Sequence, residues 1–310
     1  MRVGVDIMGG DLAPLEAVKG CIQAQAELKD VKTVLVGPKE IAEKTLLELG
    51  ASVSDFEIGD APEVITMSEH PTKAVSQKKH SSIVIGLNLL KEHQIDAFVG
   101  AGNTGAMMIG AMFTVKPIEG IIRPTITSVL PKVKGDLGVL LDVGANADCK
   151  PDVLLQFAIL GSLFAKNVYG INDPKVGLLN IGEEKEKGNL VTQVAHQQMI
   201  DSGQFNFIGN VEGRDLFNEK ADVIVCDGYT GNIVLKACES IFYTLHKRGV
   251  EDDYLGRFNY ENYGGTPILG VNEPVIIGHG ISKAGSFVKM IKMGMDVKSS
   301  GLIEQIKSSF

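Results

Sequence analysis

Residues 99–108, VGAGNTGAMM, carry three glycines at the G-x-G-x-x-G spacing typical of a dinucleotide-binding loop. In such domains the loop forms the first strand-to-helix turn, and an acid about 20 positions further on binds the ribose. Here the loop follows a later strand, and the segment around Thr125 offers no acidic side chain. We therefore expect these glycines to bring the backbone close to a phosphate or an oxyanion at a helix start. A tight turn without a ligand is the alternative.

Several other apolar runs also end in small polar or acidic residues. Ligands of open α/β sheets bind beyond the carboxyl ends of the strands, so five such ends in one chain predict a shared cleft. One or two of them would be ordinary turns. The residues at these ends are Asp6, Gly9, Gly10, Asp11, Gly102, Asn103, Thr104, Asp142, Gly144, Asn146, Glu183, Lys187, Gly188, Asn189, Asp227, Gly228, Gly231 and Asn232.

The charged stretch GEEKEKGN at 182–189 permits two interpretations. Lys187 precedes a glycine and an asparagine where a helix begins, which suits a phosphate-binding lysine. A solvated charged face is the other interpretation, and the residues alone leave both open.

Two histidines are candidates for acid–base chemistry. His196 and Asp201 have the H-x-x-x-x-D spacing of glycerolipid acyltransferases, but inside a helix positions five apart point to different faces, so we interpret the match as a coincidence. His279, in GHGISKAG between a strand and a helix, is better placed, with a capping histidine as the alternative.

A catalytic triad is not apparent. The sequence has no G-x-S-x-G elbow and no H-E-x-x-H motif, and its four cysteines form no C-x-x-C pair. We expect reduced thiols, no metal, no cofactor, and chemistry that needs no activated side chain.

The chain has 310 residues and a formal net charge of −8. This charge disfavours general nucleic-acid binding, which needs clustered Lys and Arg. No apolar run approaches the ~20 residues of a membrane span, and the chain opens directly into a strand. We expect a cytoplasmic protein.

Strand and helix patterns alternate along the chain. Continuous apolar runs at 2–6, 32–37, 96–100, 138–144, 176–182 and 222–228 each precede a helical stretch. Such runs fit parallel strands covered on both faces. The sequence therefore predicts an α/β fold, doubly wound, with a mostly parallel sheet and helices on both faces. Residues 1–310 would form a single catalytic unit with a central cleft or two lobes, with 247–265 as an exposed excursion.

Motifs along nearly the whole chain resemble the phosphate acyltransferase family, the acyl-[acyl carrier protein]:phosphate transacylases of bacterial phospholipid synthesis. Each motif is weak alone, but together and in order they are specific. They are VDIMGGDLAP, PTKAVSQKKHSS, FVGAGNTGA, RP at 123–124, LLDVGANADCKP, VGLLNIGEEKEKGN, FIGNVEGRD, VCDGYTGNIVLK, YENYGG and GHGISKA.

The resemblance implies transfer of a long-chain acyl group from acyl carrier protein to inorganic phosphate. A membrane-bound glycerol-3-phosphate acyltransferase then uses the acyl phosphate. It also implies a fold similar to phosphate acetyltransferase and the isocitrate/isopropylmalate-dehydrogenase-like proteins, a homodimer, and peripheral membrane attachment. The sequence departs from the family at Gln77, where Arg is common, and at His80, where an acid is commoner. It also departs at 247–265, which is shorter than the family's helical segment.

The implied reaction agrees with the missing triad. Phosphate, with a second pKa of about 6, is largely dianionic at neutral pH, and a thiol of pKa ~8.5 leaves readily as thiolate. The enzyme's tasks are then to orient two anionic partners and to stabilise an oxyanion.

The roles we expect follow from residue type. Lys187, Asn189 and Asn232 hold phosphate, backbone N–H groups of residues 103–105 face the thioester oxygen or phosphate, and His279 orients a reacting group or protonates the thiolate. Asp6, Asp11 and Asp142 organise loops or orient lysines. The further substrate-binding candidates are Gly9, Gly10, Gly102, Thr104, Gly105, Asn146, Glu183, Gly188, Gly228 and Gly231.

The acidic carrier protein needs a local positive surface. Lys73, Lys78 and Lys79 are one candidate group, and a second comprises Arg123, Lys132, Lys134, Lys247 and Arg248, with a solvated face as the alternative.

Three other functions stay open: a phosphate acetyltransferase acting on acetyl-CoA, an NAD-linked decarboxylating dehydrogenase of similar fold, and a non-catalytic scaffold of lipid synthesis.

Overall fold

The computed structural model describes the backbone of residues 1–310 and every side chain except that of Tyr260. The chain divides into two compact units, each assembled from separate segments. Unit 1 comprises Met1–Ile118 and Tyr260–Ser299, and unit 2 comprises Glu119–Asn259 and Ser300–Phe310.

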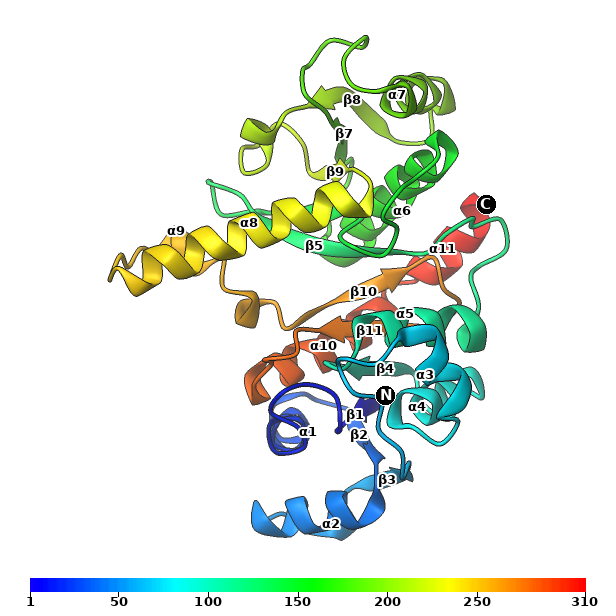
Figure 1. Ribbon diagram of the computed structural model, residues 1–310, viewed down its shortest axis with the longest axis vertical. Helices are drawn as coiled ribbons and strands as arrows, with labels where there is room; N and C mark the ends of the chain where they lie inside the picture. Colours follow the sequence, from blue (N-terminus) through cyan, green and yellow to red (C-terminus); the bar gives the residue numbers. More distant parts are fainter. The chain divides into compact units, whose positions relative to one another are not determined.

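Unit 1 contains a sheet of order β3-β2-β1-β4-β11-β10, in which only the β10–β11 pair is antiparallel (Figure 1). Val3 of β1 lies opposite Thr33 of β2 and Ala97 of β4. Its elements are β1 (Arg2–Asp6), α1 (Leu15–Glu27), β2 (Lys32–Gly37), α2 (Lys39–Glu48), η1 (Val53–Asp55), β3 (Glu57–Asp60), α3 (Pro71–Gln77), α4 (Ser82–Lys91), β4 (Ala97–Gly100), α5 (Thr104–Gly110), the π-helical η2 (Ala111–Val115), η4 (Tyr260–Asn262), β10 (Gly265–Leu269), β11 (Val275–Gly278) and α10 (Ala284–Ser299).

Unit 2 contains a sheet of order β5-β6-β9-β7-β8, in which only the β5–β6 pair is antiparallel. Val223 of β9 lies opposite Val139 of β6 and Val176 of β7. Its elements are β5 (Thr125–Pro131), β6 (Leu137–Leu141), α6 (Pro151–Tyr169), β7 (Lys175–Leu179), α7 (Leu190–Ser202), β8 (Asn206–Val211), η3 (Gly213–Asp215), β9 (Val223–Val225), α8 (Gly228–Lys247), α9 (Asp253–Gly256) and α11 (Leu302–Ser309).

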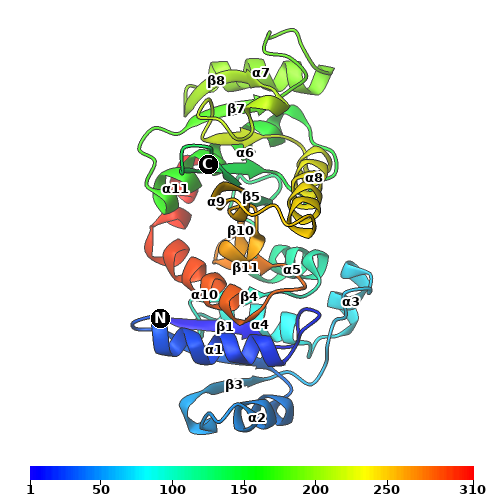
Figure 2. The ribbon, with the colours of Figure 1, turned by 90° about the vertical axis from the view of Figure 1, so that its left-hand side faces the viewer.

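Helices pack on the sheet of each unit as the apolar runs predict. In unit 1, α1 and α10 pack against each other and on the sheet, while α4 packs on β1, β2 and β4 (Figure 2). In unit 2, α6 packs on β6, β7 and β9 and contacts α7 and α11. The α/β class with mostly parallel strands and helices on both faces is confirmed.

Local chemistry sets the ends of the long helix α6, which lies next to the pocket described below. Pro151 occupies its first turn, where the missing N–H costs nothing. It ends at Gly170, whose φ of 72° is the left-handed conformation that glycine adopts freely.

The excursion predicted at 247–265 contains α9 and η4, and most of its side chains are at least partly exposed. Within unit 2 it is fastened to the β5–β6 turn, because Arg257 donates hydrogen bonds to the carbonyl oxygens of Lys132, Gly135 and Asp136, each at 2.7 Å.

Candidate active site

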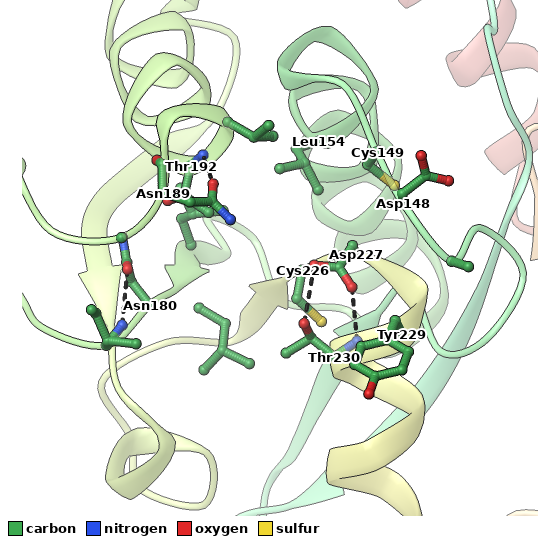
Figure 3. A pocket seen from close by; sticks show the side chains of 16 residues that line it. Asp148, Cys149, Leu154, Asn180, Asn189, Thr192, Cys226, Asp227, Tyr229 and Thr230 are labelled. Carbon is green, nitrogen blue, oxygen red and sulfur yellow. Dashed lines mark hydrogen bonds between the residues drawn. The ribbon is translucent and has the colours of Figure 1, made fainter.

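A pocket of about 730 Å³ in unit 2 lies at the carboxyl ends of the parallel strands β6, β7 and β9 (Figure 3). Helices α6, α7 and α8 all begin beside it. This is the position that the α/β topology reserves for ligands. The lining residues are Ala147, Asp148, Cys149, Leu154, Leu178, Leu179, Asn180, Ile181, Gly188, Asn189, Val191, Thr192, Cys226, Asp227, Tyr229 and Thr230.

The start of α7 forms one wall of the pocket. Gly188 has a φ of +89°, and a Cβ there would lie 2.1 Å from Thr192 Oγ1, so only glycine fits. Asn189 caps the helix, its Oδ1 accepting a hydrogen bond from Thr192 N at 2.9 Å. Both residues were predicted site residues, and the structure places them in the pocket wall.

The start of α8 forms another wall, with Asp227 as its cap. Asp227 Oδ1 accepts from Thr230 N at 2.8 Å, and Thr230 Oγ1 donates to Asp227 Oδ2 at 3.0 Å. Gly231 lets this helix lie against the end of β6, because a Cβ there would be 2.0 Å from the carbonyl oxygen of Asp142. Gly228 also lies close to Asn146, whose carbonyl oxygen would be 2.7 Å from a Cβ.

Asp142 organises the loop that joins β6 to α6. Its carboxylate is buried and accepts hydrogen bonds from Thr125 Oγ1, from the amide of Ile126 and from both the backbone and side-chain nitrogens of Asn146, at 2.6–3.1 Å. Burial raises the pKa of Asp142. These contacts give Asp142 and Asn146 a structural task, which is to hold the loop at the pocket edge.

The loop 181–189 between β7 and α7, here called the lysine loop, is anchored at several points. Asn180 Nδ2 donates to the carbonyl oxygen of Lys187 at 3.1 Å, and Asn210 Nδ2 donates to that of Glu184 at 2.8 Å. Gln193 Nε2 donates to the carbonyl oxygen of Glu186 at 2.7 Å. The loop therefore has a defined conformation although its side chains are largely exposed.

Lys187 and Asn232 are the two predicted phosphate ligands that lie outside the pocket lining. Lys187 is exposed, and its ammonium makes no ion pair with any residue that the structure describes. Asn232 is exposed on α8, and its Cγ would lie 3.5 Å from a Cβ placed on Gly144.

Glu183, which was also predicted as a site residue, belongs to an ion-pair network. Its Oε1 accepts from Lys220 Nζ at 2.7 Å and lies 3.5 Å from Arg214. Glu183, Glu212 and Asp215 could offer oxygens within 4.8 Å of one another to a metal ion. However, Lys220 and Arg214 already neutralise these oxygens. The cluster therefore holds the lysine loop through charges that the chain itself supplies.

The histidine in the H-x-x-x-x-D match has a structural position. His196 is buried and its Nδ1 pairs with Asn210 Oδ1 at 2.9 Å, while Asp201 pairs with Gln197. Because Asn210 donates its amide to the lysine loop, its oxygen must accept, so His196 carries a proton on Nδ1.

The thiols in the pocket are not activated. Burial raises the pKa of Cys149 to about 12, with Asp142 and Asp227 adding to the shift. Burial also raises the pKa of Cys226. At neutral pH both remain thiols, so neither is a nucleophile.

In unit 1, the loops after β1 and β4 pack directly on each other. A Cβ on Gly9 would lie 2.6 Å from both Asp6 Oδ2 and Gly102 N. Asp6 accepts from Met8 N at 3.0 Å, and burial raises its pKa to about 6. Gly105 is similarly constrained, because a Cβ there would be 2.4 Å from Pro71 Cγ.

Both polar atoms of the Asn103 side chain form hydrogen bonds within unit 1. Its Oδ1 caps α5 by accepting from Ala106 N at 3.0 Å, and its Nδ2 lies 3.0–3.3 Å from the carbonyl oxygens of Thr66, Met67 and Glu69. The side chain thus positions the loop, and Thr104 beside it is exposed.

The loop after β11 joins the same edge of the unit 1 sheet. The amide of Asp11 donates to the carbonyl oxygen of Gly280 at 2.6 Å. Gly10 has a φ of +101°, and a Cβ there would lie 2.8 Å from that oxygen. His279 precedes Gly280 in this loop, and its side chain is half-buried.

The lysines proposed to receive an acidic partner differ in availability. Lys78 Nζ is bound to the carbonyl oxygen of Val64 at 2.6 Å and to Glu69 at 2.8 Å, and Lys79 Nζ contacts the carbonyl oxygen of Val75 at 3.3 Å. Lys73 is exposed.

The second candidate surface needs a correction at Lys132. This lysine is buried, because its ammonium binds the carbonyl oxygen of Ala221 and the carboxylate of Asp222, so it cannot receive a partner. Arg123 donates to the carbonyl oxygen of Asp148 at 3.0 Å and thereby supports the loop at the pocket.

Several pocket residues were missed by sequence reasoning. Thr192 and Thr230 follow their capping residues by three positions, a spacing that identifies helix starts and could have placed them. Tyr229 and Asn180 carry no such signal. Among the described residues, no helix is long and apolar enough to cross a membrane.

Comparisons with known proteins agree on the family. Residues 1–248 match the family described as "Fatty acid synthesis protein". The phosphate acyltransferase of Desulforamulus reducens is 43% identical over 100% of this chain and 97% of its own length. That of Pelotomaculum thermopropionicum is 45% identical over 100% and 95%.

Solved structures with low sequence identity share the fold. A phosphotransacetylase from Streptococcus pyogenes is 18% identical with a TM-score of 0.67, covering 96% of this chain and 94% of its own. The 4-hydroxythreonine-4-phosphate dehydrogenase from Klebsiella pneumoniae is 14% identical with a TM-score of 0.61, covering 96% and 97%. The sequence relatives are much more similar than these structures and match the whole chain. The chain therefore belongs to the phosphate acyltransferase family.

Proposed function

We propose that this acyltransferase moves a long-chain acyl group from acyl carrier protein to inorganic phosphate by direct attack. A phosphate oxygen attacks the thioester carbonyl carbon, and the C–S bond breaks. The thiolate leaves with the bonding electron pair and takes a proton from solvent. The products are acyl phosphate and the free thiol of the carrier protein.

The observation that carries this proposal is Lys187, an unpaired ammonium on an anchored loop at the start of α7. Phosphate bound there gains a full positive charge beside a helix N-terminus. Asn189 Nδ2 is available as a donor because only the Oδ1 of this side chain is used in capping. Asn232, on the neighbouring α8, offers a further amide in this proposal.

Direct attack is supported by the state of the thiols and by phosphate itself. Cys149 and Cys226 remain protonated, which argues against an acyl-enzyme at the pocket. Phosphate is already largely dianionic near neutral pH and needs little help from a base. Orientation of the two substrates can contribute about 7–11 kcal/mol to lowering the barrier.

Trapping with hydroxylamine tests this function. Acyl carrier protein loaded with a long chain is mixed with phosphate, enzyme and hydroxylamine, and acyl hydroxamate is measured. We expect hydroxamate that depends on phosphate. Its absence with every acyl donor would refute the proposal, and formation from acetyl-CoA alone would favour a phosphate acetyltransferase. Reduction of NAD by a hydroxy acid would instead favour a dehydrogenase, and carrier binding without turnover a scaffold.

We further propose, from the family resemblance, a cytoplasmic homodimer that contacts the membrane surface and supplies a membrane-bound glycerol-3-phosphate acyltransferase. Sedimentation equilibrium tests the dimer, and flotation with anionic vesicles tests the membrane contact. A monomer at all concentrations, or no flotation, would remove the corresponding part.

A further inference from the structure

We propose that the pocket of unit 2 binds the aliphatic chain of the acyl donor, while phosphate is held outside it at Lys187. This inference rests on the proposed function, because it assigns one part of the donor to a site that the function leaves open. Three properties of the lining carry it: apolar side chains, polar groups of which several already form hydrogen bonds within the protein, and the sign of its charge.

Aliphatic side chains and two thiols form much of the pocket wall. Leu154 and Leu178 are buried in its floor, and Leu179 and Val191 are half-buried. At the same time Ile181 and Tyr229, which also line it, are 80% and 66% exposed. Large apolar side chains left in water at the rim of an apolar pocket favour an apolar occupant that covers them. The volume of about 730 Å³ is that of a site for a drug-sized molecule.

Three polar side chains of the lining already form hydrogen bonds within the protein. Thr192 Oγ1 donates to the carbonyl oxygen of Asn189, and Thr230 Oγ1 donates to Asp227. Asn180 uses its Nδ2 on Lys187 and its Oδ1 on the amide of Ile181. Few donors or acceptors remain for a polar ligand, so an amide-rich group would lose its hydrogen bonds with water and gain few in return.

The charge of the lining argues against phosphate in the pocket. Asp148 and Asp227 contribute two carboxylates, and no Lys, Arg or His is among the lining residues. A phosphate dianion would be repelled there, and each cap already binds one amide at its helix start, Thr192 N on α7 and Thr230 N on α8. Lys187 immediately precedes the lining residues Gly188 and Asn189. A chain in the pocket therefore leaves its reactive end beside this lysine.

The test uses Val191→Phe to fill the pocket and Val194→Phe as the matched control. Val194 lies on the same helix but is 49% exposed and does not line the pocket. Neither valine belongs to the buried core, so we expect both variants to fold, which circular dichroism and thermal melting would check.

The first readout is direct binding of n-alkyl phosphates, from butyl to decyl, measured by calorimetry. Each methylene that enters an apolar site tightens binding by about fourfold. We expect Kd to fall by up to this factor per methylene in the wild-type protein and in Val194→Phe, and the dependence to flatten for long chains in Val191→Phe. A Kd independent of chain length, no binding of any member, or an unchanged slope in Val191→Phe would overturn the proposal.

The second readout is turnover with carrier protein loaded with chains of 4 to 16 carbons. We expect Val191→Phe to lower kcat/KM at least tenfold for the longest chain and less than twofold for the shortest. An equal loss at all lengths would overturn the assignment of the chain. If no donor gives phosphate-dependent turnover, the proposed function fails, while the alkyl phosphate series still decides what the pocket binds.

Discussion

The strand ends of the two units carry similar residues but use them differently. In unit 1, the polar atoms of Asp6 and Asn103 form hydrogen bonds with the backbone of the surrounding loops, and Lys78 is bound to Glu69. In unit 2, the carboxylate of Asp142 also binds its own loop, yet the lysine loop is held by other residues, and the ammonium of Lys187 has no ion-pair partner among the residues that the structure describes. The residue type at a strand end therefore does not tell whether a side chain supports a loop or is available to bind a ligand. The hydrogen-bond partners of the side chain distinguish the two cases.

Lys187→Ala should have the largest effect on activity. Removing a charge that meets the transferred phosphate should lower kcat/KM by roughly 100- to 1000-fold, comparable to the loss of one oxyanion donor. The free energy of unfolding should not change, because the ammonium is exposed and unpaired. Phosphate-dependent hydroxamate formation and urea unfolding measure the two. Lys185→Ala, in the same loop and paired only with the exposed Glu186, is the control and should stay within about twofold.

The buried Asp6 should make the stability depend on pH. Its folded pKa of about 6 lies above the ordinary 3.8, so the folded protein binds more protons than the unfolded chain between these values. Stability from this group therefore falls as the pH rises from about 4 to 6, by roughly 3 kcal/mol in all. Urea unfolding at pH 4, 5, 6 and 7 measures it, and Asp6→Asn should remove the dependence. Parallel pH curves for the two proteins would contradict this account.

Asn103→Ala tests whether this side chain supports the fold. Loss of the cap and of the donors to three carbonyl oxygens should lower the free energy of unfolding by about 2 kcal/mol. Asn103→Asp keeps the capping oxygen but turns a second acceptor toward these carbonyl oxygens, so it should be no more stable than Asn103→Ala. Both are measured by urea unfolding. A variant of unchanged stability that loses only turnover would instead place Asn103 in contact with substrate.

Lys220→Met should have the smallest effect. Lys220 holds Glu183 of the lysine loop from a partly exposed position, and such pairs contribute up to about 1 kcal/mol. We expect KM for phosphate to rise about two- to fivefold while kcat and the melting temperature change little. Steady-state kinetics at low and high salt measure it, and the difference from the wild type should shrink at high salt. A lower kcat with unchanged KM would show that the network acts in another way.

Local patterns predicted much of the fold. The runs at 2–6 and 32–37 coincide with β1 and β2, because continuous β-branched residues are typical of a buried parallel strand. Strand β8 was missed because Asn206 and Asn210 interrupt a half-buried edge strand that alternation does not reveal. The division into two units was left open because the segments of each unit are separated in the sequence.

The candidate site was predicted only where local chemistry determines it. Gly188 and Asn189 follow from the need for a positive φ and a cap at a helix start. Tyr229 was missed because it lines a pocket formed by the ends of three strands, which meet only in the folded protein. Lys132 was predicted at the surface, and its burial depends on Asp222, a partner far away in the sequence.

The central claim is that phosphate itself takes the acyl group with the help of Lys187. The most direct measurement follows acyl phosphate by ³¹P nuclear magnetic resonance, together with release of the carrier thiol, in wild type and Lys187→Ala. The account predicts one acyl phosphate for each thiol in the wild type and loss of both signals in the variant. Thiol release without acyl phosphate, or equal rates in the two proteins, would contradict it.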